Sequence, residues 1–248
     1  MLRPTARLLS EPGFVQRSVE EFKRLSLYAM RFEGMRIPKR PYPLVSFGRR
    51  DYLDKCKTMS DSDMGGYSSS NIEFVQPDDS EPGHLRFFGS VSTELPAERP
   101  NLKGAGYVGF RTKDPKRNAF GKGFWDIDQY TFLAIRLKSD GRKYLVNLQS
   151  DGIEPTDLHQ HRIYAKRPGE WETLLIDWSE FVRTNHGLIA EPQSELLRQK
   201  VTSIGFSLVD RIPGPFDLRV QRMWATNGLQ LEEEAKNEQG ILTGFTDN

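Results

Sequence analysis

His159 and His161 are the residues whose spacing comes closest to a chemical site. They stand two positions apart, so on a strand both side chains would lie on one face, with Asp157 in phase. Imidazoles and carboxylates are common metal ligands. The sequence indicates no third or fourth ligand, and a solvated strand face is the simpler interpretation. We therefore predict no metal and no cofactor.

The usual catalytic signatures are missing. The sequence contains no G-x-S-x-G, Walker A or H-E-x-x-H motif. The glycines within 104–109 resemble a dinucleotide-binding loop, but they lie among expected strands, where close packing or a bulge explains them. The paired acids at 78–79 and 126–128 lie in turn-like stretches, where carboxylates commonly cap backbone amides. The sequence therefore predicts a protein that is not an enzyme.

The lone cysteine and the tryptophans leave one further class of function open. Cys56 has no thiol neighbour, which excludes an internal disulfide and favours a small, partly buried side chain. A stacking platform of tryptophans would indicate a carbohydrate- or other ligand-binding module. Core packing is the alternative, above all for the two that continue strand patterns, Trp171 and Trp224. The other two tryptophans are Trp125 and Trp178.

The most distinctive local stretch is the loop 60–68, Ser-Asp-Ser-Asp-Met-Gly-Gly-Tyr-Ser. Aspartates, paired glycines and flanking serines are typical of a tight loop with an exposed backbone. Such a loop could contact a partner or a cation, or it could be a turn held by its own hydrogen bonds. The candidate interaction residues are Asp61, Asp63, Gly65, Gly66 and Ser68.

Beyond residue 50, hydrophobic residues alternate with a period of two, which predicts roughly eight β-strands. Asp140 and Gly141 indicate a hairpin-type turn between two of them. Short helical turns are expected at 179–182 and 192–200. Many short strands with polar turns favour a β-sandwich or jelly roll. The expected strands are 84–92, 106–112, 130–137, 143–149, 159–166, 171–177, 203–209 and 216–225.

Residues 13–32 instead have apolar side chains at helical spacing, which predicts an amphipathic helix. This helix could pack on the body, lie on an anionic membrane surface, or dock in a partner's groove. The three prolines of 37–43 predict an extended linker after it. The candidate partner- or membrane-facing residues are Arg17, Lys23, Arg24 and Arg31.

Composition excludes several classes of protein. The 248 residues include 15 Phe and 4 Trp, enough for a real core, and no apolar run of the roughly 20 residues that span a bilayer. We therefore expect a soluble intracellular protein. Residues 1–50 hold 11 Lys and Arg against 4 acids, and the remainder holds 24 against 30. An acidic body argues against nucleic-acid binding.

The chain divides by composition into three parts. We predict a basic N-terminal arm at 1–43, a β-sandwich domain at 44–228 and an acidic tail at 229–248. The first twelve residues carry arginines and no acid before Glu11, as at the start of a mitochondrial presequence or in a frayed terminus.

Six motifs, taken in order, resemble the family of complex I intermediate-associated protein 30. The resemblance extends from about residue 50 to residue 226. One departure is Lys55-Cys-Lys-Thr-Met59, where the family often has aromatic residues. The motifs are Ser60-Asp-x-x-x-Gly-Gly-x-Ser68, Phe87-Phe-Gly-Ser-Val91, Gly104-x-Gly-Tyr-Val-Gly-Phe-Arg111, Asp140-Gly-Arg-x-Tyr144, Gly169-Glu-Trp-Glu-Thr173 with Asp177-Trp-Ser-Glu-Phe181, and Gly214-Pro-Phe-Asp-Leu218.

The resemblance implies an all-β jelly-roll sandwich of the galactose-binding-domain-like type, with the amphipathic helix preceding it. It also implies a non-enzymatic assembly factor, a chaperone that holds a membrane-arm intermediate of mitochondrial complex I. Its partners would be membrane-arm subunits and other assembly factors. Its place would be the mitochondrial matrix, peripheral to the inner membrane. The family supplies no catalytic residues, and the loop from Asp61 to Ser68 is its hallmark.

Overall fold

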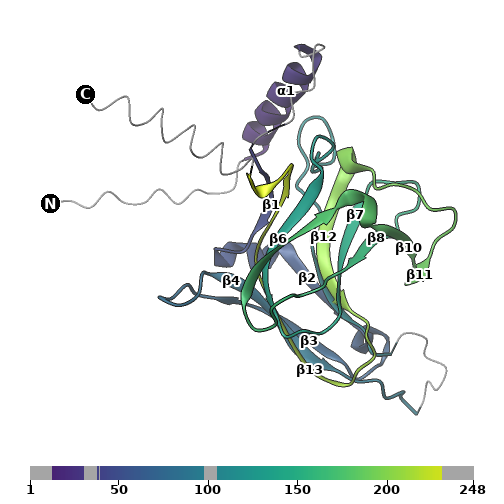
Figure 1. The fold of residues 1–248 in the computed structure, drawn as a ribbon. Coiled ribbons are helices and arrows are strands. Elements are labelled where there is room, and N and C mark those ends of the chain that lie inside the picture. The colour runs from purple at the N-terminus through teal and green to yellow at the C-terminus, as the bar shows by residue number, and fades with distance from the viewer. Residues whose placement is uncertain (1–12, 31–37, 39, 98–104, 231–248) are drawn as a thin grey trace. The chain divides into compact units, whose positions relative to one another are not determined.

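The computed structural model describes residues 13–30, 38, 40–97 and 105–230. They form two units (Figure 1), of which the first combines helix α1 (Phe14–Met30) with the segment 115–123. Within this unit the Arg17 guanidinium donates two hydrogen bonds, of 3.3 and 3.1 Å, to the carbonyl of Arg117. The Ala119 amide donates to the Ser18 hydroxyl at 2.9 Å. The helix lies where its apolar spacing predicts it.

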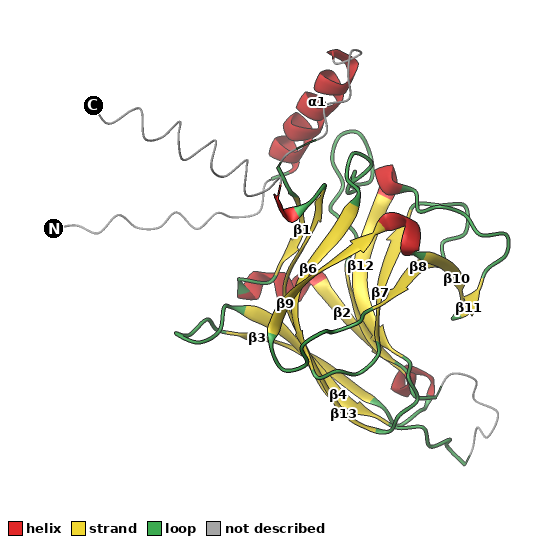
Figure 2. Ribbon diagram, viewed as in Figure 1, coloured by secondary structure: helices red, strands yellow, loops and turns green. Residues whose placement is uncertain are grey.

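The second unit consists of two antiparallel sheets, drawn in yellow in Figure 2. Sheet A runs in the order β3 (Ser69–Val75), β4 (His84–Val91), β13 (Gly214–Thr226), β6 (Phe132–Ser139) and β9 (Trp171–Asp177), and β1 (Tyr42–Ser46) also pairs with β13. Sheet B runs in the order β11 (Leu188–Ile189), β10 (Val182–Asn185), β8 (Asp157–Arg162), β7 (Tyr144–Ser150), β12 (Val201–Leu208), β5 (Val108–Thr112) and β2 (Cys56–Ser60).

The expected β-sandwich is confirmed, and each of the eight expected segments overlaps a strand, although β8 ends four residues earlier than the expected 159–166. The strands β1, β2, β3, β10 and β11 were not expected. Strand β1 begins inside the Pro-rich stretch at 37–43. Tyr42 and Pro43 already pair with β13, although the domain was expected to start at residue 44. A proline is tolerated there because β1 pairs with one strand, β13, as an edge strand does, and the missing N–H of proline can face away from that strand.

The prediction of a hairpin at Asp140 and Gly141 was wrong. Strand β6 belongs to sheet A and strand β7 to sheet B, so the turn carries the chain from one sheet to the other. Gly141 has a φ of +91°, which permits a tight turn in either kind of connection. The local turn signal therefore does not reveal which strands the turn joins.

The two expected helical turns are shorter than predicted and are 3₁₀ helices. The first covers Trp178–Glu180, and the chain then enters β10. The second covers only Arg198–Lys200. Two further 3₁₀ helices, Arg50–Lys55 and Asp61–Met64, flank β2.

Aromatic side chains form the centre of the core between the two sheets. The rings of Phe87 on sheet A and Phe110 on sheet B are fully buried, with centroids 5.0 Å apart. Phe206 contacts Phe110 from β12, and Phe216 contacts Phe87 from β13. Such tilted ring pairs add specific contacts to the burial of apolar area, and the Phe87–Phe110 pair joins one sheet to the other.

Candidate functional site

The loop between β2 and β3 is organised by the buried carboxylate of Asp61. Asp61 Oδ1 accepts a hydrogen bond of 2.9 Å from the Ser68 amide. Its Oδ2 accepts one of 2.9 Å from the Ser68 hydroxyl and one of 2.6 Å from the Gly106 amide. Asp61 has no exposed surface, so these donors replace water around the carboxylate. The contact to Gly106 fastens the loop to the chain that enters β5.

The other motif residues of this loop allow the backbone to fold tightly around Asp61. Gly65 has a φ of +97° and ends the 3₁₀ helix in the left-handed region, where glycine is favoured. A Cβ atom on Gly66 would lie 2.5 Å from the Asp61 carboxyl carbon. Ser60 and Asp63 form a capping box, in which the Ser60 amide donates to the Asp63 carboxylate at 3.4 Å.

Only part of the predicted interaction loop is available to a partner. Asp61 and Ser68 are buried, whereas Asp63 and Gly65 are exposed. Two large apolar side chains between them, Met64 and Tyr67, are 44% and 58% exposed. The loop is thus a turn held by its own hydrogen bonds, and contact with a partner through its exposed residues stays a prediction.

A second cluster of motif residues holds the connection between β12 and β13. The Arg142 guanidinium donates to both carboxylate oxygens of Asp210, at 2.7 and 3.1 Å. It also donates to the carbonyls of Gly214 and Pro215. Burial raises the pKa of Asp210, but the hydrogen bonds from Arg142 and from the backbone outweigh burial and leave this pKa below its ordinary value.

Asp140 completes this second cluster from the turn between the sheets. Its Oδ2 accepts hydrogen bonds from the Tyr144 hydroxyl at 3.1 Å and from the Asp217 amide at 2.8 Å. An open pocket of about 300 Å³ lies beside Asp140, Arg142 and Asp210. Because these charged groups are bonded to one another and to backbone, the pocket presents no catalytic constellation.

Other motif acids serve the same structural purpose. Glu172 is buried and accepts hydrogen bonds from the amides of Lys166 and Arg167, at 3.0 and 3.3 Å. Asp177 accepts from the Ser179 amide at 2.8 Å and so caps a 3₁₀ helix. The capping role expected of residues 78–79 is confirmed for Asp78, which accepts from the amides of its turn. The motifs therefore hold loops in place.

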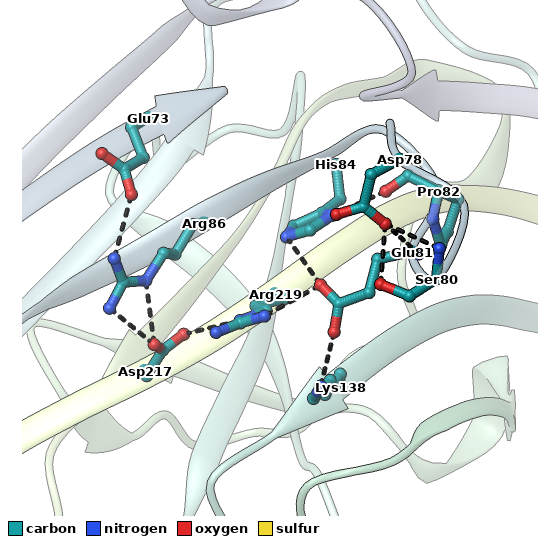
Figure 3. A network of polar contacts seen from close by, with 10 residues as sticks. All are labelled: Glu73, Asp78, Ser80, Glu81, Pro82, His84, Arg86, Lys138, Asp217 and Arg219. Carbon is teal, nitrogen blue, oxygen red and sulfur yellow. Dashed lines mark hydrogen bonds and ion pairs between the residues drawn. The ribbon is translucent and has the colours of Figure 1, made fainter. Parts of the chain in front are cut away.

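A network of alternating charges lies on the outer face of sheet A and was not predicted from the sequence (Figure 3). We call it the charged ladder, and it consists of Glu73, Arg86, Asp217, Arg219, Glu81 and Lys138. The shortest contact joins Lys138 Nζ to Glu81 Oε1 at 2.6 Å. Alternation along β4 and β13 indicates outward-facing charges, but their partners lie up to 138 residues apart in the sequence.

His84 is buried beside the charged ladder. Its Nδ1 lies 2.7 Å from the Pro82 carbonyl, which only accepts, so Nδ1 carries a proton. Its Nε2 lies 3.9 Å from Glu81 Oε2, and the ring packs edge-on against Trp171 with centroids 5.1 Å apart. His84 therefore fills the space between the 76–83 turn and β9.

The solvated strand face expected for His159 and His161 was wrong. They lie opposite Leu148 and Val146 in the pairing of β7 with β8, so both point to the core side of sheet B. Burial lowers the pKa of both imidazoles. His159 Nε2 contacts the Ser194 carbonyl at 3.0 Å. Asp157 is held by Arg183 at 2.6 Å, and no group of three potential metal ligands occurs in the described ranges.

Cys56 and the tryptophans are integrated into the fold. Cys56 is buried, and burial raises its pKa to about 12, which keeps the thiol protonated and unreactive. Trp178 and Trp224 are buried, and Trp125 and Trp171 are half-buried. Trp178 belongs to the core between the sheets, whereas Trp224 is buried on the outer face of sheet A, under Arg222, so the core packing expected of Trp224 is not found. None of the four tryptophans is fully exposed as a stacking platform.

The basic helix residues are placed only in part. Arg17 contacts the 115–123 segment, as described above, and Lys23 is exposed. The side chain of Arg24 and all of Arg31 lie outside the described residues. No helix in the described part of the chain is long and apolar enough to cross a membrane. The expected roles of residues 1–12 and 231–248 also fall outside the described ranges.

The fold and its loop clusters define a β-sandwich protein whose motif residues hold its loops in place. Its fold is similar to that of a family 11 carbohydrate-binding module from Clostridium thermocellum, with a TM-score of 0.50 at 15% identity, over 76% of this chain and 96% of the module. At that identity the likeness concerns the fold alone.

The sequence comparisons define the family. The model of the complex I intermediate-associated protein 30 family matches residues 45–220, and the chain belongs to this family. It is 43% identical to "Complex I intermediate-associated protein 30, mitochondrial" of Neurospora crassa over 233 residues, 87% of this chain and 84% of the relative. The relatives of the same name in Drosophila melanogaster and Mus musculus are 27% identical, and the match spans 64% and 60% of their length.

Proposed function

We propose that the protein is an assembly factor for mitochondrial complex I. The observation that carries the proposal is the 43% identity with the Neurospora crassa relative, whose name joins complex I intermediates with mitochondria. The shared family model covers nearly the whole sandwich, so the likeness is not confined to one motif. The protein would therefore act in mitochondria, during the formation of complex I.

The proposed mechanism is holding rather than catalysis. Every motif cluster described above fastens a loop to the sandwich, and a rigid scaffold with fixed loops suits a protein that presents a binding surface. We infer that this surface holds a membrane-arm intermediate, together with other assembly factors, from the matrix side of the inner membrane. The exposed residues Asp63, Met64 and Tyr67 are candidates for the contact.

The test is to follow the protein by native-gel complexome profiling of digitonin-solubilised mitochondria. We expect it to migrate with a subcomplex that contains membrane-arm subunits and to be absent from mature complex I. Normal formation of complex I after removal of the gene, with the protein found only as a small free species, would contradict the proposal. A carbohydrate-binding role is tested separately: glycan-array binding that is lost on mutating Trp125 would support it, and silence across the array would count against it.

A further inference from the structure

Two arginines face each other on the outer face of sheet A. Arg222 on β13 pairs directly with Arg136 on β6, so both side chains leave the sheet on the same side. Residues opposite each other in an antiparallel pair have Cβ atoms about 4.5–5.5 Å apart, and like charges there destabilise the sheet. Arg222 is exposed and Arg136 half-buried, so both side chains keep some contact with solvent.

The charged ladder on the same face does not neutralise this pair. Each of its three cations contacts one or two of its three carboxylates, at distances from 2.6 to 3.4 Å. Within the described ranges, neither Arg136 nor Arg222 forms an ion pair with a carboxylate. Two positive charges therefore stand side by side next to a network that is otherwise balanced.

The neighbouring side chains hold both guanidinium groups in place. Arg222 stacks on the Trp224 ring with its central carbon 4.4 Å from the ring centroid. Stacking uses the flat face of the guanidinium and leaves its N–H edge available. Arg136 Nη1 lies 3.5 Å from the Thr173 hydroxyl, which accepts this contact and keeps its own proton to donate. The two guanidinium groups and the Thr173 hydroxyl thus form a cluster of hydrogen-bond donors, and no negatively charged acceptor in the described residues contacts them.

We propose that Arg136 and Arg222, with Thr173, bind a phosphate group. Guanidinium forks match the spacing of oxygens on phosphate. A phosphate monoester, with about two negative charges, would neutralise both arginines, and the single charge of a phosphodiester would offset their mutual repulsion. The phosphate could belong to a phospholipid headgroup or to a soluble phosphate compound, since both offer the same oxygens. This inference goes beyond the proposed function and does not depend on it.

A phosphate site and a merely structural pair have opposite consequences for stability. If the arginines stabilised the sheet, replacing one of them would lower the unfolding midpoint. If they are kept for a ligand, Arg136→Gln removes a like-charge repulsion, so the midpoint of the ligand-free protein stays equal or rises. Circular dichroism during thermal unfolding measures this directly and shows in addition that the variants fold.

Binding is tested on the full-length chain with vesicle co-sedimentation. We expect the wild-type protein to bind vesicles of phosphatidylcholine with phosphatidylglycerol, and to bind pure phosphatidylcholine vesicles much less. The R136Q/R222Q variant should bind at least about tenfold more weakly, because one charge-assisted hydrogen bond is worth that factor. The control R167Q/R211Q removes two exposed arginines elsewhere and should bind like wild type. Both variants keep the basic N-terminal arm, so their difference reports on the pair.

Calorimetric titration with inorganic phosphate and with glycerol phosphate separates the two sources of the ligand. Binding of either compound that R136Q/R222Q abolishes assigns the site to soluble phosphates. Pair-dependent vesicle binding without measurable binding of these compounds assigns it to lipid headgroups. Equal binding by R136Q/R222Q and wild type in both assays, or no binding by the wild type in either, would overturn the proposal.

Discussion

At the residue scale, the carboxylate of Asp61 can be tested by removing a single charge. Asp61→Asn replaces an acceptor oxygen by an NH₂ group, which leaves at least one of the three donors around it without a partner. An unsatisfied buried donor costs about 1–3 kcal/mol, so we expect the free energy of unfolding to fall by that amount. Urea denaturation measures it. The control Asp63→Asn changes an exposed acid of the same loop, and an equal loss in both variants would contradict the role of Asp61.

A substitution at Gly66 tests the packing around Asp61 by adding volume instead of removing a charge. A Cβ atom there would lie 2.5 Å from the Asp61 carboxyl carbon, so Gly66→Ala must displace the buried carboxylate. Overpacking of this kind costs about 1–3 kcal/mol. Gly48→Ala is the matched control, because its Cβ would meet only the Ser46 hydroxyl at 3.8 Å. If thermal unfolding shows the same midpoint for both variants, the loop is more adaptable than its contacts indicate.

The sequence predicts residue types in this loop better than their partners. Two aspartates with paired glycines and serines indicate a tight turn because each favours turn conformations by itself. That Asp61 rather than Asp63 is buried depends on the Gly106 amide, 45 residues away. The outward direction of His159 and His161 was mispredicted for a related reason: the strand period places both on one face but does not say which face meets the core.

At the scale of elements, Arg142 holds the connection between the two sheets. Arg142→Gln would leave the Asp210 carboxylate, whose side chain is 3% exposed, without its cation. Breaking a buried pair on one side costs about 3–5 kcal/mol. Chemical denaturation should show a loss of this order. Arg167→Gln, which breaks an exposed pair with Glu170, is expected to change stability by at most about 1 kcal/mol.

The charged ladder predicts a loss of stability in acid. The hydrogen bond from Lys138 holds the pKa of Glu81 below its ordinary value of 4.5. A carboxyl whose pKa is lower in the folded state contributes its stability above the unfolded pKa and loses it as the pH falls through the folded pKa. The urea midpoint should therefore decline in acid, and less steeply in Glu81→Gln. The exposed Glu170→Gln should follow the wild-type curve, and an unchanged slope in Glu81→Gln would exclude Glu81 as a contributor.

Local patterns predict strands but not their neighbours. Most of the eight expected strands are rich in apolar residues, and β12 is buried along its whole length. By contrast, β2 and β3 flank the polar hallmark loop, and β11 has only two residues. The residue types at Asp140 and Gly141 suit a tight turn both in a hairpin and in a connection between two sheets, so they cannot distinguish the two. The contacts that decide the connection join residues far apart in the sequence. Arg142 is 68 positions from Asp210 and 72 from Gly214, so no pattern of neighbouring residues reveals them.

At the scale of the whole molecule, the family hallmark can be assigned either to folding or to contact with partners. Asp61 is buried, so its replacement should act through stability: less protein would accumulate in mitochondria, and complex I would fall in proportion. Growth at lower temperature should restore both together. A contact residue behaves differently, because its replacement leaves the amount of protein normal while association with the assembly subcomplex is lost.

Comparing Asp61→Asn with Tyr67→Ala separates these two cases in one experiment. Tyr67 is 58% exposed on the same loop, and its truncation leaves the hydrogen bonds of Asp61 intact. We expect Tyr67→Ala to accumulate normally and to migrate with the subcomplex less than wild type, since exposed aromatic residues are common anchors of protein interfaces. Immunoblots of native and denaturing gels measure both quantities. Normal migration of Tyr67→Ala, with reduced amounts of Asp61→Asn, would make the hallmark a purely structural motif and place the partner surface elsewhere on the sandwich.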